Sequence, residues 1–303
     1  MALPLLVFAS DSTWVQVRIP VACIREGKGH ATEMSSQAIM GMPMLVLDDD
    51  GGEWLYLKAP DGYTGYVNIS SVARKSHREM LAWRKAPRLT VTGMNEVKVI
   101  TDTLSGYAPR NIVTGLVDGS IVEGQLSGGG FTRVTLPDGR AGYTQSSALM
   151  PVGEWASQPF DARAILDRCH YLMGTPYLWG ACSTKGVDCS GLVRVALYAN
   201  GILTLRDARQ QIEIGKRIEP DNIDGLQPAD LMFFSSTPDG RIGHVAVFDS
   251  GDTYIHSSGL VKVSRMTPDD PDWSSRCYRG ASRINGMTGT PGIWQIKNHP
   301  WYF

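Results

Sequence analysis

The stretch that decides the fold is Gly-Val-Asp-Cys-Ser-Gly-Leu-Val, residues 186–193, which puts a cysteine at the first turn of a predicted helix. Apolar residues at helical spacing continue to about Asn200, and Gly201 follows where such a helix would stop. Unpaired amides and the helix dipole stabilise an anion at the first turn. Since the thiolate is the reactive form of cysteine, this position favours Cys189 as a nucleophile over its commoner role as a small buried hydrophobic residue.

A cysteine nucleophile needs a base, and two of the six histidines lie where a base is expected. His244 opens the predicted strand 244–248, and His256 lies in the predicted strand 253–257. Adjacent antiparallel strands can bring two such side chains together. We therefore expect His244 to be the base and His256 to orient its ring, as the third member of a triad does.

The last part of the chain has the pattern of an α+β fold. Asp161 is expected to cap a helix from Ala162 to about Met173, which Gly174 and the following Pro176 would end. The nucleophile helix follows, and then come apolar runs typical of strands, at 231–234, 244–248, 253–257, 261–265 and 277–284. A helix layer followed by successive antiparallel strands is an α+β arrangement.

The first half of the chain contains two similar segments of short apolar runs separated by turns. The runs of the first segment are 15–23, 43–47, 54–57 and 65–67, and those of the second are 89–91, 97–100, 119–124, 131–136 and 141–143. In both segments a strand precedes a Pro-Asp-Gly turn, at 60–62 and 137–139, and a Gly-Tyr pair opens the next strand. This weak internal repeat predicts two small β-barrels, and the charged link 76–87 predicts one short helix between them.

Composition excludes several classes of protein. The net charge of −1 over 303 residues gives no basic surface for nucleic acid or anionic membranes. No stretch approaches the ~20 apolar residues of a membrane span. The five cysteines form no Cys-x-x-Cys pair, which argues against a zinc site, and their irregular spacing argues against a disulfide scaffold.

Residues 1–10 are apolar but lack Lys and Arg, so we expect an entry strand and not a secretory signal. Free thiols and the missing signal favour the cytoplasm, while a periplasmic or envelope location stays open if a signal was removed. The chain is expected to be a monomer.

Four blocks, at 177–180, 188–192, 226–231 and 243–247, closely resemble the catalytic domain of the NlpC type in the NlpC/P60 superfamily. They cover most of residues 160–285. The resemblance implies a papain-like cysteine peptidase with Cys189 as nucleophile, His244 as base and His256 as third member, and with no metal or organic cofactor.

The two preceding segments resemble the bacterial SH3-like barrels of a murein-recycling subgroup. The implied division is a first barrel at 1–75, a linker at 76–88, a second barrel at 89–152 and the catalytic domain at 153–303. That subgroup hydrolyses the γ-D-glutamyl-diamino acid bond of murein peptides and releases L-Ala-γ-D-Glu. Its first barrel blocks one end of the cleft, so that only a free N-terminal L-Ala fits.

The resemblance also implies substrate-binding residues. Glu33 and a barrel tyrosine, Tyr66 in preference to Tyr63, would bind the amine. In the catalytic domain the implied contacts are Tyr177, Asp188, Ser190 and Asp207, the last followed by Ala208 where the family often has serine.

Simpler interpretations stay open for these residues. Glu33 and Asp207 can equally be solvated or capping carboxylates. An amidase or acyltransferase on the same framework, and a non-catalytic wall-binding protein, are the alternative functions.

Overall fold

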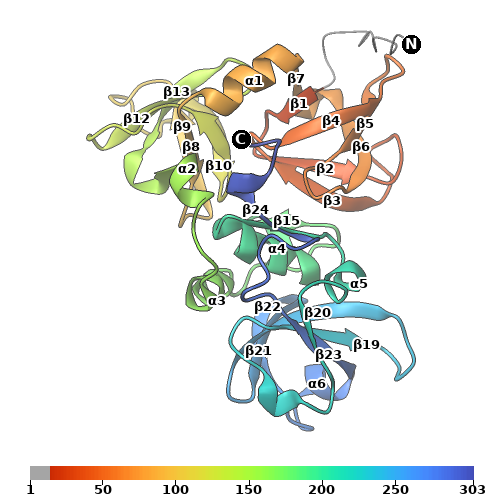
Figure 1. Ribbon diagram of the computed structural model, residues 1–303. Coiled ribbons are helices and arrows are strands. Elements are labelled where there is room, and N and C mark those ends of the chain that lie inside the picture. The colour runs from red at the N-terminus through yellow and green to blue at the C-terminus, as the bar shows by residue number, and fades with distance from the viewer. Residues whose placement is uncertain (1–13) are drawn as a thin grey trace, which may run out of the picture.

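The computed structural model describes residues 14–303, so the strand expected at residues 1–10 lies outside the described residues. Two antiparallel sheets fill the first half of the chain (Figure 1). The first has the order β3-β2-β6-β5-β4-β1-β7, and its strands are β1 (Trp14–Val17), β2 (Val21–Arg25), β3 (Met34–Ile39), β4 (Pro43–Asp48), β5 (Trp54–Lys58), β6 (Thr64–Asn68) and β7 (Val72–Lys75). The second has the order β10-β9-β13-β12-β11-β8-β14, and its strands are β8 (Arg88–Val91), β9 (Glu96–Ile100), β10 (Ile112–Val117), β11 (Ile121–Glu123), β12 (Phe131–Thr135), β13 (Ala141–Gln145) and β14 (Leu149–Pro151).

The two sheets have the same strand order, which confirms the internal repeat predicted from the sequence. The Pro-Asp-Gly turns connect equivalent strands, and Gly62 and Gly139 in these turns both have a φ of 87°, a backbone region that favours glycine. Two predicted strands were wrong in extent. The run 15–23 is divided into β1 and β2 at Pro20, which has no N–H for a ladder, and the run 119–124 contains only the short β11 after a turn at Gly119.

The predicted linker helix is confirmed as α1 (His77–Lys85). Ser76 and Glu79 form a reciprocal capping box at its start, which satisfies two backbone donors. Met80 and Trp83 are buried on its inner side. A short helix α2 (Val152–Trp155) then leads from the second sheet into the last part of the chain.

The last part has the predicted α+β arrangement. Its helices are α3 (Ala162–Tyr171), which Asp161 caps as expected, α4 (Cys189–Ala199), α5 (Ala208–Gln211) and α6 (Pro271–Ser274). The main sheet has the order β18-β23-β19-β20-β21-β22, with β18 (Lys216–Ile218), β19 (Leu231–Ser235), β20 (Ile242–Ser250), β21 (Thr253–Ser258), β22 (Leu260–Arg265) and β23 (Cys277–Arg283). Two small ladders pair β15 (Cys182–Ser183) with β16 (Gly186–Val187) and β17 (Ile202–Thr204) with β24 (Ile293–Gln295).

Helix α4 lies between the main sheet and the barrels (Figure 1), and all its residues up to Tyr198 are buried. Leu192 and Val193 belong to the core that includes Phe233 and Val245 of the sheet, whereas Tyr198 belongs to the core of the first barrel. Full burial of one such side chain stabilises the fold by about 1.5–3 kcal/mol. The nucleophile helix is therefore fixed from both sides.

The end of the chain packs back onto the first barrel. Tyr302 is fully buried, and the rings of Trp14 and Trp301 meet edge to face with centroids 5.0 Å apart. The ring nitrogen Nε2 of His299 lies 3.0 Å from the carbonyl oxygen of Pro60. These contacts hold the barrel against the catalytic part. Within residues 14–303, none of the helices combines the length and apolarity needed to cross a bilayer.

Candidate active site

Cys189 is the first residue of α4, as the sequence predicts, and Asp188 caps the helix. Asp188 Oδ1 accepts a hydrogen bond from the backbone N–H of Gly191 at 2.7 Å. A Cβ at Gly191 would lie 2.0 Å from the carbonyl oxygen of Ala181, so only glycine fits there. The local sequence Asp-Cys-Ser-Gly thus supplies the cap, the thiol and the close approach that sets the start of the helix.

The two predicted histidines meet on neighbouring strands. His244 on β20 and His256 on β21 have Nε2 and Nδ1, respectively, 2.9 Å apart. His256 has no exposed surface, and the ring of Tyr254 packs edge to face against it with centroids 5.0 Å apart. The expected pairing of the two rings across adjacent antiparallel strands is therefore present in the structure.

Cys189 lies against the strand that carries His244. The backbone N–H groups of Val245, the residue after His244, and of Ser190 act on the thiol and lower its pKa. Among the described residues no hydrogen bond joins the Sγ of Cys189 to the His244 ring. The Cys189 thiol and the His244 ring therefore both lie where α4 meets β20. Proton transfer between them is part of the proposed function.

Burial controls the protonation states of both groups. Burial, and to a smaller extent the Asp188 carboxylate, raise the pKa of Cys189 to about 11, although the backbone N–H groups of Val245 and Ser190 act in the opposite direction. Burial also lowers the pKa of His244 well below the usual value, helped by neighbouring His256. At neutral pH these directions give a thiol and a neutral imidazole. They differ from the resting thiolate expected from the helix dipole, because burial of the sulfur is the largest influence on its pKa.

Asp188 belongs to a buried ion pair, which the sequence did not predict. Both its oxygens are used: Gly180 N–H donates to Oδ2 at 3.0 Å, and the Arg206 guanidinium donates to both oxygens. Arg206 Nη1 also donates to Ser190 Oγ at 2.8 Å, and its Nε donates to Ser36 Oγ of β3 at 3.2 Å. Asp188 also lines the cleft beside Cys189, so its role as a substrate contact stays a prediction, while its carboxylate pairs with Arg206.

A cleft of about 280 Å³ opens beside the nucleophile, between the first barrel and the catalytic part. Cys189, Ser190, Tyr177 and Asp207 line it from the catalytic side, and Glu33 lines it from the barrel. The structure thus gathers most of the predicted substrate residues around one opening. Ala208 is also at its wall, at the position where the family often has serine.

The geometry of the cleft favours Tyr63 over Tyr66, the barrel tyrosine preferred from the sequence. Tyr63 lines the cleft, and burial raises its pKa, with the Asp207 carboxylate acting in the same direction. Tyr66 is not among the lining residues. Its ring packs against Tyr56 with centroids 5.0 Å apart and lies below the Lys28 ammonium. The sequence Asp-Gly-Tyr-Thr-Gly-Tyr contains both tyrosines, and only the path of the turn after Gly62 decides between them.

Trp179 and Glu26 are among the cleft residues that were not predicted from the sequence. Trp179 is 60% exposed, and its Nε1 donates a hydrogen bond to Glu33 Oε1 at 2.6 Å. Glu26 adds a second barrel carboxylate to the lining. Trp179 belongs to the block 177–180 that resembles the family, so its place near Tyr177 in the cleft could have been predicted. No sequence motif pointed to Glu26.

Tyr177 lines the same cleft as the thiol of Cys189. Burial raises the pKa of Tyr177 to about 12, with contributions from Cys189 and Asp188. Its hydroxyl therefore keeps its proton at neutral pH and can donate a hydrogen bond to a developing oxyanion.

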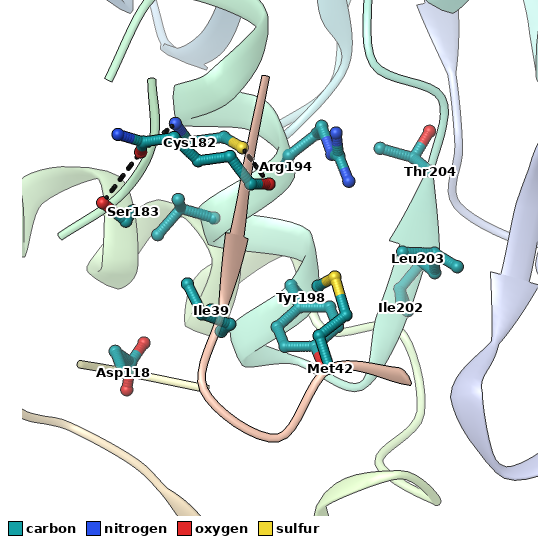
Figure 2. Close-up of a pocket in the computed structure, with 12 residues that line it drawn as sticks. Ile39, Met42, Asp118, Cys182, Ser183, Arg194, Tyr198, Ile202, Leu203 and Thr204 are labelled. Atoms are coloured by element: carbon teal, nitrogen blue, oxygen red, sulfur yellow. Dashed lines mark hydrogen bonds between the residues drawn. The ribbon is translucent and has the colours of Figure 1, made fainter. Parts of the chain in front are cut away.

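A second cavity, of about 30 Å³, lies between α4 and the two barrels and contains no catalytic candidate (Figure 2). Gln37 Oε1 accepts hydrogen bonds there from the backbone N–H of Cys182 and from Ser183 Oγ, each at 3.0 Å. Nearby, a Cβ at Gly180 would lie 2.2 Å from the carbonyl oxygen of Met34. Strand β3 and the segment before the nucleophile helix are therefore tightly joined. No cluster of three metal-ligand side chains occurs within residues 14–303.

Comparisons with known proteins agree with this geometry. Residues 174–281 match the model of the NlpC/P60 family, and residues 24–72 match that of the bacterial dipeptidyl-peptidase SH3 domain. Dipeptidyl-peptidase 6 of Lysinibacillus sphaericus is 28% identical over 75% of this chain and 80% of its own length. The probable endopeptidase NlpC of Escherichia coli (strain K12) is 39% identical over 37% of this chain and 70% of its own length. The gamma-D-glutamyl-L-lysine dipeptidyl-peptidase of Bacillus subtilis (strain 168) is 27% identical over 74% of this chain and 72% of its own length.

A solved structure confirms the fold. The crystal structure of an NlpC/P60 family protein from Bacillus cereus ATCC 10987 superposes with a TM-score of 0.75 at 18% identity. The match covers 90% of this chain and 99% of that one. The combination of an SH3-like region and a papain-like catalytic part, predicted from the sequence, is thus an established architecture.

Proposed function

This chain belongs to the NlpC/P60 family of peptidases, and from that premise we propose that it hydrolyses the γ-D-glutamyl-diamino acid bond of murein peptides with a free N-terminal L-Ala. The observation that carries the proposal is the cleft beside Cys189, which the first barrel lines with the carboxylates of Glu26 and Glu33. A carboxylate at the end of a cleft forms a charge-assisted hydrogen bond with an ammonium group. The name of the Bacillus subtilis relative, gamma-D-glutamyl-L-lysine dipeptidyl-peptidase, points to the same substrate class, and the Lysinibacillus sphaericus relative is also named a dipeptidyl-peptidase.

In the proposed reaction the sulfur of Cys189 attacks the carbonyl carbon of the γ-glutamyl amide. Its proton passes to Nδ1 of His244, the ring nitrogen that His256 leaves free. The backbone N–H of Cys189 and the hydroxyl of Tyr177 stabilise the oxyanion, and one such donor contributes about 10²–10³ in rate.

His244 then protonates the leaving amine, and the C–N bond breaks to leave a thioester on Cys189. A water molecule gives a proton to the same imidazole and attacks the thioester. The products are L-Ala-γ-D-Glu and the diamino acid, and the thiol is restored. Since burial keeps the thiol and the imidazole neutral, proton transfer accompanies the attack and does not precede it.

The selectivity for a free amine is attributed to the barrel side of the cleft. Glu33 and the hydroxyl of Tyr63 face the opening there, and Asp207 approaches Tyr63 from the catalytic side. An N-terminal ammonium placed among these groups lies one dipeptide away from the scissile bond. A longer chain on that side would meet the barrel wall.

The test is turnover of L-Ala-γ-D-Glu-diaminopimelate, followed by mass spectrometry, against the same peptide acetylated at its amine. Release of L-Ala-γ-D-Glu from the free peptide alone supports the proposal. Release of an intact stem peptide from muropeptides would instead indicate an amidase, and wall binding without hydrolysis would indicate a binding protein. Full activity of Cys189→Ser would reject the mechanism.

A further inference from the structure

We propose that a chain of hydrogen bonds from Asp272 through Ser264 and His256 sets the tautomer of His244 and so leaves its Nδ1 free to act as the base. Ser264 and Asp272 are then positioning residues for the proposed reaction, on whose cysteine-peptidase function the inference rests. Neither residue lies in the four blocks of sequence that resemble the family.

The outer end of the chain is an ionised carboxylate. Burial raises the pKa of Asp272, but hydrogen bonds from Lys262 and Arg276 outweigh burial and hold the pKa well below its usual range. Lys262 Nζ lies 2.6 Å from Oδ2, and Arg276 Nη1 lies 3.0 Å from Oδ1. An ionised carboxylate has no proton to donate and accepts only. The direction of the whole chain is therefore fixed at this end.

Each following link has one possible direction. Ser264 Oγ lies 3.3 Å from Asp272 Oδ2 and donates its proton to it. The same Oγ lies 3.2 Å from Nε2 of His256. Because the hydroxyl proton of Ser264 is already donated to Asp272, this Oγ accepts a hydrogen bond from Nε2–H of His256. A neutral imidazole carries one proton, so Nδ1 of His256 has a lone pair. It accepts from the Nε2–H of His244 at 2.9 Å, and the remaining lone pair of His244 is on Nδ1.

Both rings must be neutral for this argument, and their surroundings support that state. The pKa of His256 is lowered to about 4, chiefly by burial and also by the Arg276 and Lys262 cations, while the Asp272 and Asp270 carboxylates act in the opposite direction. The same cations and Asp272 act on His244. Of the two neutral tautomers of each ring, the chain selects the one with hydrogen on Nε2.

The structure supplies a matched pair of hydroxyls for the test. Ser264 and Ser258 each donate to one oxygen of Asp272, at 3.3 and 3.2 Å. Of these two serines, it is Ser264 that also forms a hydrogen bond with His256. Ser264→Ala removes the link, whereas Ser258→Ala removes an equivalent bond to the same carboxylate. The first readout is ¹⁵N NMR of the histidine rings in the full chain above pH 7, which distinguishes the Nδ1–H and Nε2–H tautomers without any substrate. The second readout is kcat and KM for the free tripeptide.

We expect Nε2–H signals for both rings in the unmodified protein and a shift of His256 toward Nδ1–H in Ser264→Ala. The kcat should fall about tenfold, the effect of one lost hydrogen bond, with KM unchanged. Ser258→Ala should keep both tautomers and a kcat within about twofold. Ser264 and Asp272 act through one chain of hydrogen bonds. The double variant Ser264→Ala with Asp272→Asn should therefore lower kcat little more than the worse of the two single changes.

Nδ1–H signals for His244 in the unmodified protein, or equal losses of kcat in Ser264→Ala and Ser258→Ala, would overturn the inference. If Ser264→Ala does not fold, Asp272→Asn in the unaltered Ser264 background gives the same NMR readout. An inactive but correctly tautomeric protein would count against the proposed function alone, since the NMR readout needs no turnover.

Discussion

Nε1 of Trp179 donates a hydrogen bond to Oε1 of Glu33 at 2.6 Å, across 146 positions of the sequence. The contact joins the wall of the cleft on the catalytic side to the first barrel and fixes the direction of one carboxylate oxygen. The other oxygen stays available to a ligand. This relationship makes Glu33 the first residue to test.

Glu33→Gln should raise KM for the free tripeptide by about tenfold or more, because a hydrogen bond to a charged group contributes about 1.5–3 kcal/mol. The glutamine oxygen can still accept from Trp179, so the wall of the cleft should keep its shape. Kinetics with free and N-acetylated peptide measure the effect, and the preference for the free amine should shrink. An unchanged preference would remove Glu33 from the amine site.

Tyr63→Phe and Tyr66→Phe form a matched pair on the same barrel. Loss of the Tyr63 hydroxyl should lower kcat/KM about five- to tenfold, as expected for one hydrogen bond to the substrate. Tyr66→Phe should stay within about twofold, because Tyr66 is outside the cleft lining. Steady-state kinetics of both variants decide, and a larger loss in Tyr66→Phe would restore the assignment made from the sequence.

Arg206→Ala should lower the free energy of unfolding by about 3–5 kcal/mol, because it leaves the Asp188 carboxylate buried without its partner. Arg265→Ala is the control, since Arg265 forms an exposed ion pair with Asp252, and it should cost at most about 1 kcal/mol. Denaturant titration of both variants measures the difference. Similar midpoints for the two would mean that Asp188 is solvated when Arg206 is absent.

Alkylation of Cys189 by iodoacetamide should be slow at pH 6–7 and accelerate as the pH rises, because burial raises the pKa of the thiol to about 11. Mass spectrometry of the peptide that carries Cys189 separates its reaction from that of the partly exposed Cys23, Cys182 and Cys277. A rate that reaches its plateau below pH 7 would show a resting thiolate paired with His244, as the helix position alone suggests.

His256 should make the fold less stable in acid. Its pKa is about 4 in the folded chain against a usual 6.5, so the unfolded chain binds the proton first, and stability is lost as the pH falls from 6.5 toward 4. The full difference corresponds to about 3 kcal/mol. Asp118 titrates in the same window with the opposite sign, because burial raises its pKa to about 6.

The histidine contribution must therefore be measured as the difference between the unmodified protein and His256→Gln. Denaturant titrations at intervals from pH 4 to 7 should show a smaller loss on acidification in the variant. If the unmodified protein and His256→Gln lose equal stability on acidification, His256 has the same pKa in the folded and the unfolded chain.

The sequence was sufficient wherever local rules decide the structure. The charged link 76–87, the cap at Asp161 and the glycine turns predicted α1, α3 and the repeat, because each of these depends on neighbours in the chain. The pairing of His244 with His256 was also predictable, since consecutive antiparallel strands place close positions side by side.

Contacts between distant segments were beyond such rules. Arg206 pairs with Asp188 and reaches Ser36, which lies 170 positions away. The choice of Tyr63 over Tyr66 depends on how the turn of one barrel faces another part of the chain. The raised pKa of Cys189 depends on how deeply α4 is buried, and the helix dipole, a local feature, pointed the other way.

The close approach of Gly180 to the carbonyl oxygen of Met34 has a practical meaning for protein engineering. A different barrel grafted onto this catalytic part would bring its own backbone to the contact between Gly180 and the barrel. There is no room for one extra methyl group at that contact. Successful chimaeras should therefore exchange the barrel together with residues 177–183. A search for variants that accept longer or shorter peptides would then vary the barrel and residues 177–183 together.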